Sequence, residues 1–322
     1  MLFADNFKEL IALRRQHPDF KVILSVGGWT LSSQFPPMAS SAESRRAFVA
    51  SCVTNLRQWG LDGLDLDWEY PTAAEKTNFA ALITELRAAF DEESARTGRV
   101  RLTLGAAVAA VSTKGYDITT MAENLDLVNV MTYNFHGSQR RPKLTGHSSP
   151  LYPSNSDRPH YSTSGAMEAW ANLGIPKSKL LVGLSFYGNT WSLTNASDHG
   201  LGAAANGPAP AGPITRKAGV LAYNEICGLV QSGQLKRVMD AKSCAPYALG
   251  GTTWVSYDDT ESIRGKAKWI MTNDFAGAFV WEISFDDFAG QCGSSKALLT
   301  ALKDGLGQSA NHINPSAATH TQ

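Results

Sequence analysis

An alternation of acidic and apolar residues in the segment Leu61–Pro71 constrains this chain more than any other feature. The segment reads Leu-Asp-Gly-Leu-Asp-Leu-Asp-Trp-Glu-Tyr-Pro and places Asp65, Asp67 and Glu69 at every second position. Alternate side chains of a β-strand share one face, so a strand here sets three carboxyl groups opposite three apolar side chains, Leu64, Leu66 and Trp68. The sequence therefore predicts a strand with one acidic and one buried face.

Three carboxylates this close repel one another, so at least one of their pKa values is expected to rise. A carboxyl group that stays protonated near neutral pH can act as a general acid. Two other interpretations are a solvated acidic edge and a divalent-metal site. The interleaved apolar residues argue against the first, and the lack of a His or a further carboxylate cluster beside the segment argues against the second.

The composition indicates one large ordered core and excludes several classes of protein. The chain has 322 residues, of which 43% are hydrophobic. Lys plus Arg and Asp plus Glu both number 29, which gives no charge signature for nucleic acid or an anionic membrane. No apolar run approaches the ~20 residues of a membrane-spanning helix. Many of the 8 Trp, 9 Tyr and 13 Phe residues are expected in the core, and a surplus of such rings is also what a carbohydrate groove uses.

The chain alternates predicted strands and helices with short connections, which favours parallel strands covered by helices. The predicted strands are 21–26, 61–68, 100–108, 127–133, 180–187 and 276–283, and the predicted helices are 6–17, 44–59, 78–95, 164–173 and 295–303. Polar chemistry at the carboxyl ends of several strands is typical of a (β/α) barrel. We expect an α/β barrel in residues 1–189 and 257–306, an α+β insertion in 190–256 and a polar tail or linker in 307–322.

Four cysteines are present, and they show no close metal-type pair. Cys227, Cys244 and Cys292 lie in the C-terminal third, where one disulfide is expected. Cys52 lies in a helical pattern and is expected to be a buried free thiol. The first residues do not form a signal peptide, so secretion cannot be read from this N-terminus.

Several motifs together resemble family 18 of the glycoside hydrolases, the chitinases, in its animal-type branch. The acidic motif Asp62–Glu69 carries the resemblance most strongly. The other motifs occur in family order along the chain: Ser25–Trp29, Met131–Asn134, Gly183–Gly188, Leu221–Cys227, Trp281–Ile283 and Asp286–Cys292. The resemblance implies a (β/α)8 TIM barrel with an α+β insertion, and a disulfide between Cys227 and Cys292.

The resemblance implies a retaining, substrate-assisted mechanism, in which the N-acetyl group of the substrate replaces an enzyme nucleophile. Glu69 would protonate the glycosidic oxygen. Asp67 would hold the acetamido N–H, Asp65 would share a proton with it, and Tyr133 would hydrogen-bond the acetyl oxygen. No metal and no cofactor are implied. The expected substrate-binding residues are Trp29, Tyr70, Met131, Asn134, Tyr187 and Trp281. Ser25 is expected to support the inner acids and His136 to be a hydrogen-bonded structural residue.

The chain departs from the family pattern at several positions. Asn134 stands where Asp is frequent, Gln139 replaces a Trp, and Asn189 stands where Arg is usual. Lys217 falls where the acidic partner of that Arg is expected. The first two barrel strands also have no counterpart here. We expect a truncated fragment; the alternative is that the barrel closes in another way, including with strands from another chain.

The sequence thus predicts a secreted, monomeric chitinase, endo- or exo-acting, which hydrolyses β-1,4-linked N-acetylglucosamine in chitin or chito-oligosaccharides. A chitinase-like lectin that binds these sugars without turnover is the alternative from another class. Glu69 favours the enzyme, since such lectins have usually lost the terminal acid. An endo-β-N-acetylglucosaminidase acting on glycoprotein glycans is a third interpretation, disfavoured by the insertion and the animal-type C-terminal motifs.

Overall fold

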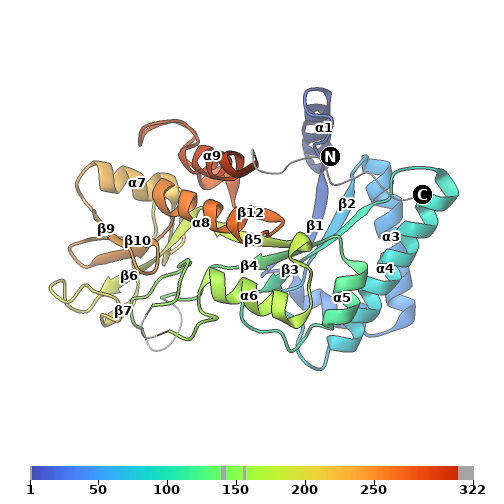
Figure 1. Cartoon of the computed structure of the whole chain (residues 1–322), viewed down its shortest axis with the longest axis horizontal. Helices are drawn as coiled ribbons and strands as arrows, with labels where there is room; N and C mark the ends of the chain where they lie inside the picture. The colour runs from blue at the N-terminus through green and yellow to red at the C-terminus, as the bar shows by residue number, and fades with distance from the viewer. Residues whose placement is uncertain (1, 139–142, 155–156, 311–322) are drawn as a thin grey trace. The chain divides into compact units, whose positions relative to one another are not determined.

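The computed structural model describes residues 2–138, 143–154 and 157–310 (Figure 1). The chain forms two compact units. The first unit combines Met1–Val130 with Trp170–Leu180, and the second combines Met131–Ala169 with Leu181–Gln322.

The first unit is built on parallel strands whose neighbours follow the order of the chain. These strands are β1 (Ile23–Gly27), β2 (Gly63–Asp67), β3 (Thr103–Ala109) and β4 (Leu127–Met131). Strand β2 pairs in parallel with both neighbours: Gly27 is opposite Asp67, and Leu64 is opposite Leu104. The carboxyl ends of β1 and β2 therefore meet at one edge of the sheet.

Helices connect these strands, and the first unit contains α1 (Leu2–Ala12), α2 (Phe35–Ala39), α3 (Ala42–Trp59), α4 (Lys76–Thr97) and α5 (Ile118–Asn124). Figure 1 shows α3, α4 and α5 next to one another along the blue-to-green part of the chain. Helix α3 begins where the Ser41 side chain accepts a hydrogen bond from the Ser44 N–H, and it ends at Gly60 in the left-handed conformation. Helix α5 was not predicted, because seven residues give too little periodicity.

The second unit contains the parallel strands β5 (Leu180–Ser185) and β12 (Gly277–Trp281), which pair with each other. Its helices include α8 (Thr260–Thr272) and α9 (Ala297–Ala310), and α6 (Thr163–Leu173) is divided between the two units. The fully buried Lys266 of α8 forms an ion pair of 2.6 Å with Asp258 and donates to the Ser149 hydroxyl at 2.9 Å. The buried ammonium group is thus paired and hydrogen-bonded, as burial of a charge requires.

An antiparallel sheet forms the rest of the second unit. Its strand order is β7 (Ala205–Pro208), β6 (Tyr187–Leu193), β11 (Thr253–Ser256), β10 (Ala245–Gly250) and β9 (Lys236–Asp240), with β8 (Val220–Ala222) paired to β6. Helix α7 (Tyr223–Gln231) follows β8. Trp191 and Trp254 are fully buried and pack edge to face at 5.2 Å in the core of this sheet.

All six strands predicted for the α/β part form, within a few residues of their expected ends. The last helix continues to Ala310, past the predicted end at residue 303, so the first four residues of the expected tail are helical. The remainder of that tail, 311–322, lies outside the described residues, as does Gln139. Among the helices that the structure describes, none combines the length and the apolar character needed to cross a membrane.

Candidate functional site

The acidic strand β2 has the two faces that its sequence predicts. Leu64 and Leu66 are fully buried and Trp68 is nearly so. The strand ends at Asp67, however, and Glu69 lies two residues beyond it in a bend. Only two of the three acids therefore belong to the strand, because the chain turns after Trp68.

Asp65 is held by hydrogen bonds to both of its carboxylate oxygens. The Ser25 hydroxyl of β1 donates to Oδ2 at 2.8 Å, which confirms the supporting role expected for Ser25. Asn129 of β4 donates from Nδ2 to Oδ1 at 2.9 Å. Loss of hydration raises the pKa of Asp65, and the two hydrogen bonds offset part of that rise.

The ionisation of Asp67 is also disfavoured. Burial raises its pKa to about 7, and the neighbouring charges of Glu69 and Asp65 contribute to the rise. Its Oδ1 is buried without a hydrogen-bond partner among the described residues. Asp67 therefore has an oxygen available to an additional donor.

Hydrogen bonds hold both the backbone and the carboxyl group of Glu69. Its N–H donates to the Ser32 hydroxyl oxygen at 2.7 Å. Burial raises the pKa of its carboxyl group, while hydrogen bonds from the Tyr70 hydroxyl and the Trp29 backbone N–H lower it in part. The expected rise of at least one pKa in this cluster is thus confirmed, and it affects all three acids.

The loop after β1 closes tightly over the end of β2. The Gly28 N–H donates to the Asp67 carbonyl oxygen at 2.7 Å, and the Ser32 hydroxyl donates to the Gly28 carbonyl at 2.9 Å. Gly27 has φ of 118°, and a Cβ there would lie 2.2 Å from the Asp67 carbonyl oxygen. Only glycine fits this close approach.

A row of aromatic rings packs beneath the acids. Trp68 contacts Phe79 at 5.7 Å, Phe79 contacts Tyr116 at 5.7 Å, and Tyr116 contacts Trp170 at 5.3 Å. These rings are buried, and they remove the lower side of the acidic strand from water. The low-polarity layer explains why desolvation is the largest cause of the raised pKa values.

Two predicted substrate-binding residues of the first unit reach solvent. The side chain of Trp29 is 77% exposed, and that of Tyr70 is 38% exposed. Exposed aromatic rings beside buried acids are suited to stacking on an apolar face of a ligand.

Tyr133 and Tyr187 lie together in the second unit. Their ring centroids are 6.2 Å apart, and Tyr133 also contacts Phe279 of β12 at 6.2 Å. Met131 and Tyr187 are buried, whereas Tyr133 is half-buried. The structure thus brings Tyr133 and Tyr187 into one aromatic cluster.

Asn134 follows this cluster and is exposed, with φ of 59°. Its Oδ1 accepts hydrogen bonds from the Tyr187 hydroxyl at 3.0 Å and from Asn189 Nδ2 at 2.9 Å. Asn189, which stands where the family pattern has Arg, is buried and contacts Asn134. Lys217 is exposed.

Trp281 and His136 are two further residues of the second unit to which the sequence analysis assigned a role. Trp281, at the end of β12, is 52% exposed. His136 forms a 3.0 Å hydrogen bond with Asp157, in agreement with its expected structural role.

Sequence reasoning missed Asn129 and Ser32. Asn129 shares the period-two alternation of β4 with Met131, so the strand pattern could have indicated its direction. Ser32 begins a short 3-10 helix, Ser32–Gln34, and no sequence pattern signals its contacts.

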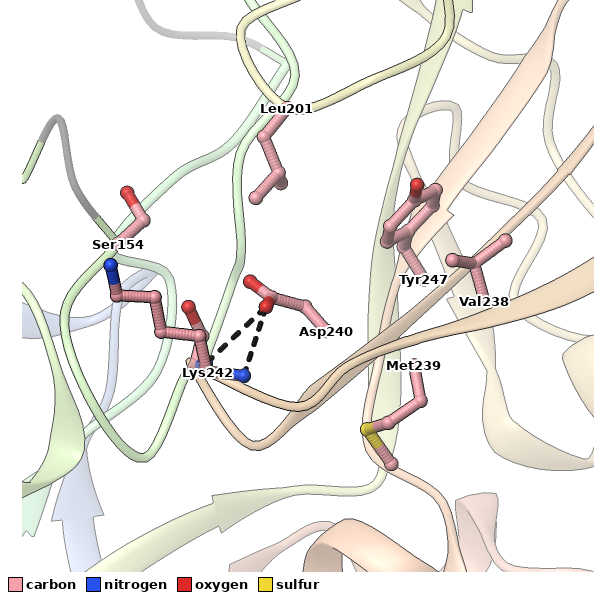
Figure 2. A pocket seen from close by; sticks show the side chains of 8 residues that line it. Ser154, Leu201, Val238, Met239, Asp240, Lys242 and Tyr247 are labelled. Atoms are coloured by element: carbon pink, nitrogen blue, oxygen red, sulfur yellow. Dashed lines mark hydrogen bonds between the residues drawn. The ribbon is translucent and has the colours of Figure 1, made fainter.

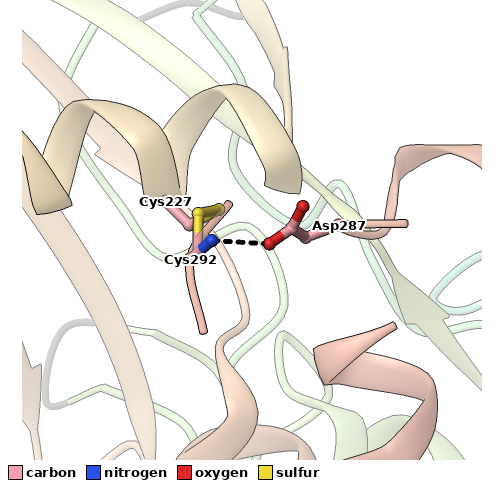
Figure 3. Close-up of side chains that lie close together, drawn as sticks. All are labelled: Cys227, Asp287 and Cys292. Carbon is pink, nitrogen blue, oxygen red and sulfur yellow. Dashed lines mark hydrogen bonds between the residues drawn. A yellow bond between two sulfur atoms is a disulfide. The ribbon is translucent and has the colours of Figure 1, made fainter. Parts of the chain in front are cut away.

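The disulfide implied by the resemblance joins Cys227 of α7 to Cys292, with their Cα atoms 5.8 Å apart (Figure 3). Asp287 lies beside it and accepts the Cys292 N–H at 2.7 Å. The two sulfur atoms are bonded to each other and so cannot bind a metal as thiolates. Cys52 is a buried free thiol, as expected, and Cys244 is also free.

The second unit also contains a hollow of about 510 Å³ (Figure 2). Asp240 lies in it and accepts the backbone N–H of Lys242 at 3.1 Å. The remaining lining residues are Ser154, Leu201, Val238, Met239, Ser243 and Tyr247. None of the substrate-binding residues predicted from the sequence lines this hollow.

Comparisons with known proteins give a consistent result. Residues 2–286 match the sequence profile of the family described as Glycosyl hydrolases family 18. Chitotriosidase-1 of Mus musculus is 40% identical over 296 residues, which cover 88% of this chain and 62% of that protein. The chain thus spans about three fifths of the length of that relative.

Solved structures share the fold. A structure described as an immunomodulatory active chitinase from Trichuris suis has a TM-score of 0.89 and 38% identity, and the match covers 93% of this chain and 84% of that one. Human YKL-39, described as a pseudo-chitinase with retained chitooligosaccharide binding properties, also has a TM-score of 0.89, with 36% identity over 94% of this chain and 84% of that one. These matches confirm the predicted fold, a TIM barrel with an insertion, of which six parallel strands are present in the described residues.

Proposed function

Because the chain belongs to glycosyl hydrolase family 18, we propose that it is a chitinase that cleaves β-1,4 N-acetylglucosamine linkages with retention of configuration. The observation that carries this proposal is Glu69, a carboxyl group with a raised pKa, two residues after the buried acid Asp67. A raised pKa favours the protonated form of the carboxyl group, which is the form that general-acid catalysis of glycoside cleavage requires.

In the proposed reaction, Glu69 donates its proton to the glycosidic oxygen as the bond to the anomeric carbon breaks. The acetamido carbonyl oxygen of the same sugar attacks that carbon and forms an oxazolinium ion. Glu69, now ionised, then takes a proton from water, which opens the ring from the side of the departed sugar and restores the original configuration. The hydrogen bonds of the Glu69 carboxyl group with Tyr70 and Trp29 support this role because they orient that group, and Ser32 holds the Glu69 backbone N–H.

Asp67 is proposed to accept the acetamido N–H and thereby to orient the attacking carbonyl. Its unpartnered Oδ1 supports this role, because that oxygen lacks the hydrogen bond that a buried acceptor requires. The positive charge that develops on the oxazolinium favours ionised Asp67, whose ionisation is otherwise disfavoured. Asp65, fixed by Ser25 and Asn129, provides the neighbouring carboxyl that raises the pKa of Asp67.

The remaining predicted residues are proposed to bind sugar. Tyr133 would hydrogen-bond the acetyl oxygen, and the exposed rings of Trp29 and Trp281 would stack on sugar faces. Tyr70, Tyr187, Met131 and Asn134 complete the set proposed to contact substrate. The scheme has no step that calls for a metal or a cofactor.

We further propose that the protein is secreted and acts as a monomer on chitin or chito-oligosaccharides. The disulfide between Cys227 and Cys292 supports an oxidising compartment. The proposed mechanism is compatible with both endo and exo action.

A chitinase-like lectin is the second candidate. The similarity to human YKL-39, with its described loss of activity and retained sugar binding, favours it. The altered residues Asn134 and Asn189 favour it as well. The presence of Glu69 with all three acids in place supports the enzyme instead.

Hydrolysis and binding of the N-acetylglucosamine tetrasaccharide separate the two candidates. The unmodified chain and a Glu69→Gln variant are measured side by side, with turnover followed by product chromatography and binding by calorimetry. Turnover that is lost in the variant while binding persists supports the enzyme. Binding without turnover in either protein supports the lectin, and absence of both would reject both proposals.

A further inference from the structure

The side chain of Asn189, on β6, is fixed in one orientation by its surroundings. Its Nδ2 lies 3.1 Å from the His136 backbone carbonyl, 2.7 Å from the Ser148 hydroxyl and 2.9 Å from Asn134 Oδ1. A carbonyl oxygen only accepts hydrogen bonds, so the nitrogen rather than the oxygen of Asn189 must face His136. Since Asn189 is buried, turning its amide would leave two acceptors facing each other without water.

This orientation determines that of Asn134. Because Asn189 presents N–H groups, Asn134 must present its Oδ1 to them. The Tyr187 hydroxyl donates to the same Oδ1 at 3.0 Å. The Nδ2 of Asn134 therefore faces the other way, and the described residues offer it no acceptor. Asn134 is exposed, so this NH₂ group is available to a ligand.

We propose that Asn189 is a positioning residue that makes Asn134 a hydrogen-bond donor to the sugar. The ligand must then offer an acceptor at this place, a hydroxyl or carbonyl oxygen of an N-acetylglucosamine unit. The inference rests on the proposed function in taking a chito-oligosaccharide as the ligand. It extends that function by stating which ligand group position 134 selects. An Asp at position 134 would present an acceptor here and would therefore select a hydrogen-bond donor of the ligand, whereas Asn134 selects an acceptor.

Asn134 and Asn189, two departures from the family pattern, are in direct contact and pair as neutral amides. An Asp at 134 could only accept hydrogen bonds, whereas Asn134 accepts from Asn189 through its oxygen and can donate outward through its nitrogen.

The first test measures binding of the N-acetylglucosamine tetrasaccharide by calorimetry, in a Glu69→Gln background that prevents turnover. Asn134→Asp replaces the outward donor by an acceptor at an exposed residue, and circular dichroism checks that the variant is folded. We expect the dissociation constant to rise about tenfold. Asn195→Asp, an equal change of charge at another exposed residue of the same unit, should leave it unchanged within twofold. An unchanged dissociation constant in Asn134→Asp would overturn the proposal.

The second test needs no ligand and separates this inference from the proposed function. The side-chain amide of Asn134 is assigned in ¹⁵N NMR spectra by its loss in Asn134→Asp, and its exchange with water is measured. We expect fast exchange for Asn134 and slow exchange for the buried amide of Asn189. A protected Asn134 amide would contradict the orientation, even if the tetrasaccharide does not bind at all.

Asn189→Asp tests the positioning role itself. A carboxylate at 189 only accepts hydrogen bonds, so Asn134 should turn and donate its N–H groups inward. The Asn134 amide should then become protected from exchange, and tetrasaccharide binding should weaken about tenfold, as in Asn134→Asp. A folded variant in which Asn134 still exchanges fast would overturn the positioning role. If the variant does not fold, the two preceding measurements decide the proposal.

Discussion

The Ser25 hydroxyl on β1 donates a hydrogen bond of 2.8 Å to Asp65 on β2, so one strand holds the innermost acid of its neighbour. Asn129 does the same from β4 at 2.9 Å. These two donors stabilise the ionised form of Asp65, which burial otherwise disfavours. Support for the acids thus comes from the strands around them.

Ser25→Ala should destabilise the protein by about 1 kcal/mol, because it leaves one oxygen of Asp65 without its donor. Denaturation by urea measures the change in the free energy of unfolding. Ser33→Ala, at an exposed residue of the following loop, is the matched control and should change it by less than about 0.5 kcal/mol. Equal effects of the two substitutions would show that the Ser25 contact contributes nothing specific.

Asp67→Asn should stabilise the protein at pH 7.5 and change how stability depends on pH. The folded-state pKa of Asp67, about 7, lies above its usual value of 3.8. Between these values the folded state binds more protons than the unfolded state, so this residue makes stability fall as pH rises from about 4 to 7. Removal of the ionisable group should recover on the order of 4 kcal/mol at pH 7.5.

Urea denaturation at pH 4.5 and pH 7.5 measures this effect. Glu92→Gln, at an exposed carboxyl group of α4, is the matched control and should leave the pH dependence unchanged. The free energy of unfolding should differ less between the two pH values in Asp67→Asn than in the unmodified chain. An equal difference in both proteins would show that the pKa of Asp67 is not raised.

Trp29 and Trp68 should respond oppositely to replacement by Ala. Trp29 is 77% exposed, so its loss should cost little stability but weaken sugar binding. Trp68 is buried between Phe35 and Phe79, so its loss should cost about 3–5 kcal/mol. Thermal unfolding and tetrasaccharide calorimetry on both variants test this. Unaltered affinity in a folded Trp29→Ala would remove Trp29 from the binding site.

Replacing both Cys227 and Cys292 by Ser should lower the free energy of unfolding by about 4 kcal/mol, since the disulfide closes a loop with a sequence separation of 65. Cys244→Ser removes a free thiol and should have a small effect by comparison. Urea denaturation of both variants checks the difference. Equal stability of the double variant and the unmodified chain would contradict a structural role for this bond.

The sequence predicts those features that depend on a short-range pattern. The alternation around Asp65 predicted the strand and its buried face, and the structure has both. The turn that separates Glu69 from β2 is not visible in that pattern, because Trp68 continues the alternation past the end of the strand.

Contacts between distant segments could not be predicted in this way. Asn129 is 64 positions from Asp65, and Asn189 is 55 positions from Asn134. Their pairing depends on sheet register and on the path of the loop after β4, which single-sequence periodicity does not encode.

The configuration of the first product tests the proposed mechanism most directly. The N-acetylglucosamine tetrasaccharide is added to the protein, and the anomeric proton signals are followed by NMR from the first minutes, before mutarotation. Substrate assistance through the acetamido group predicts that the β-anomer appears first and that Glu69→Gln gives no product. Early appearance of the α-anomer, or equal turnover in the variant, would contradict the proposed mechanism.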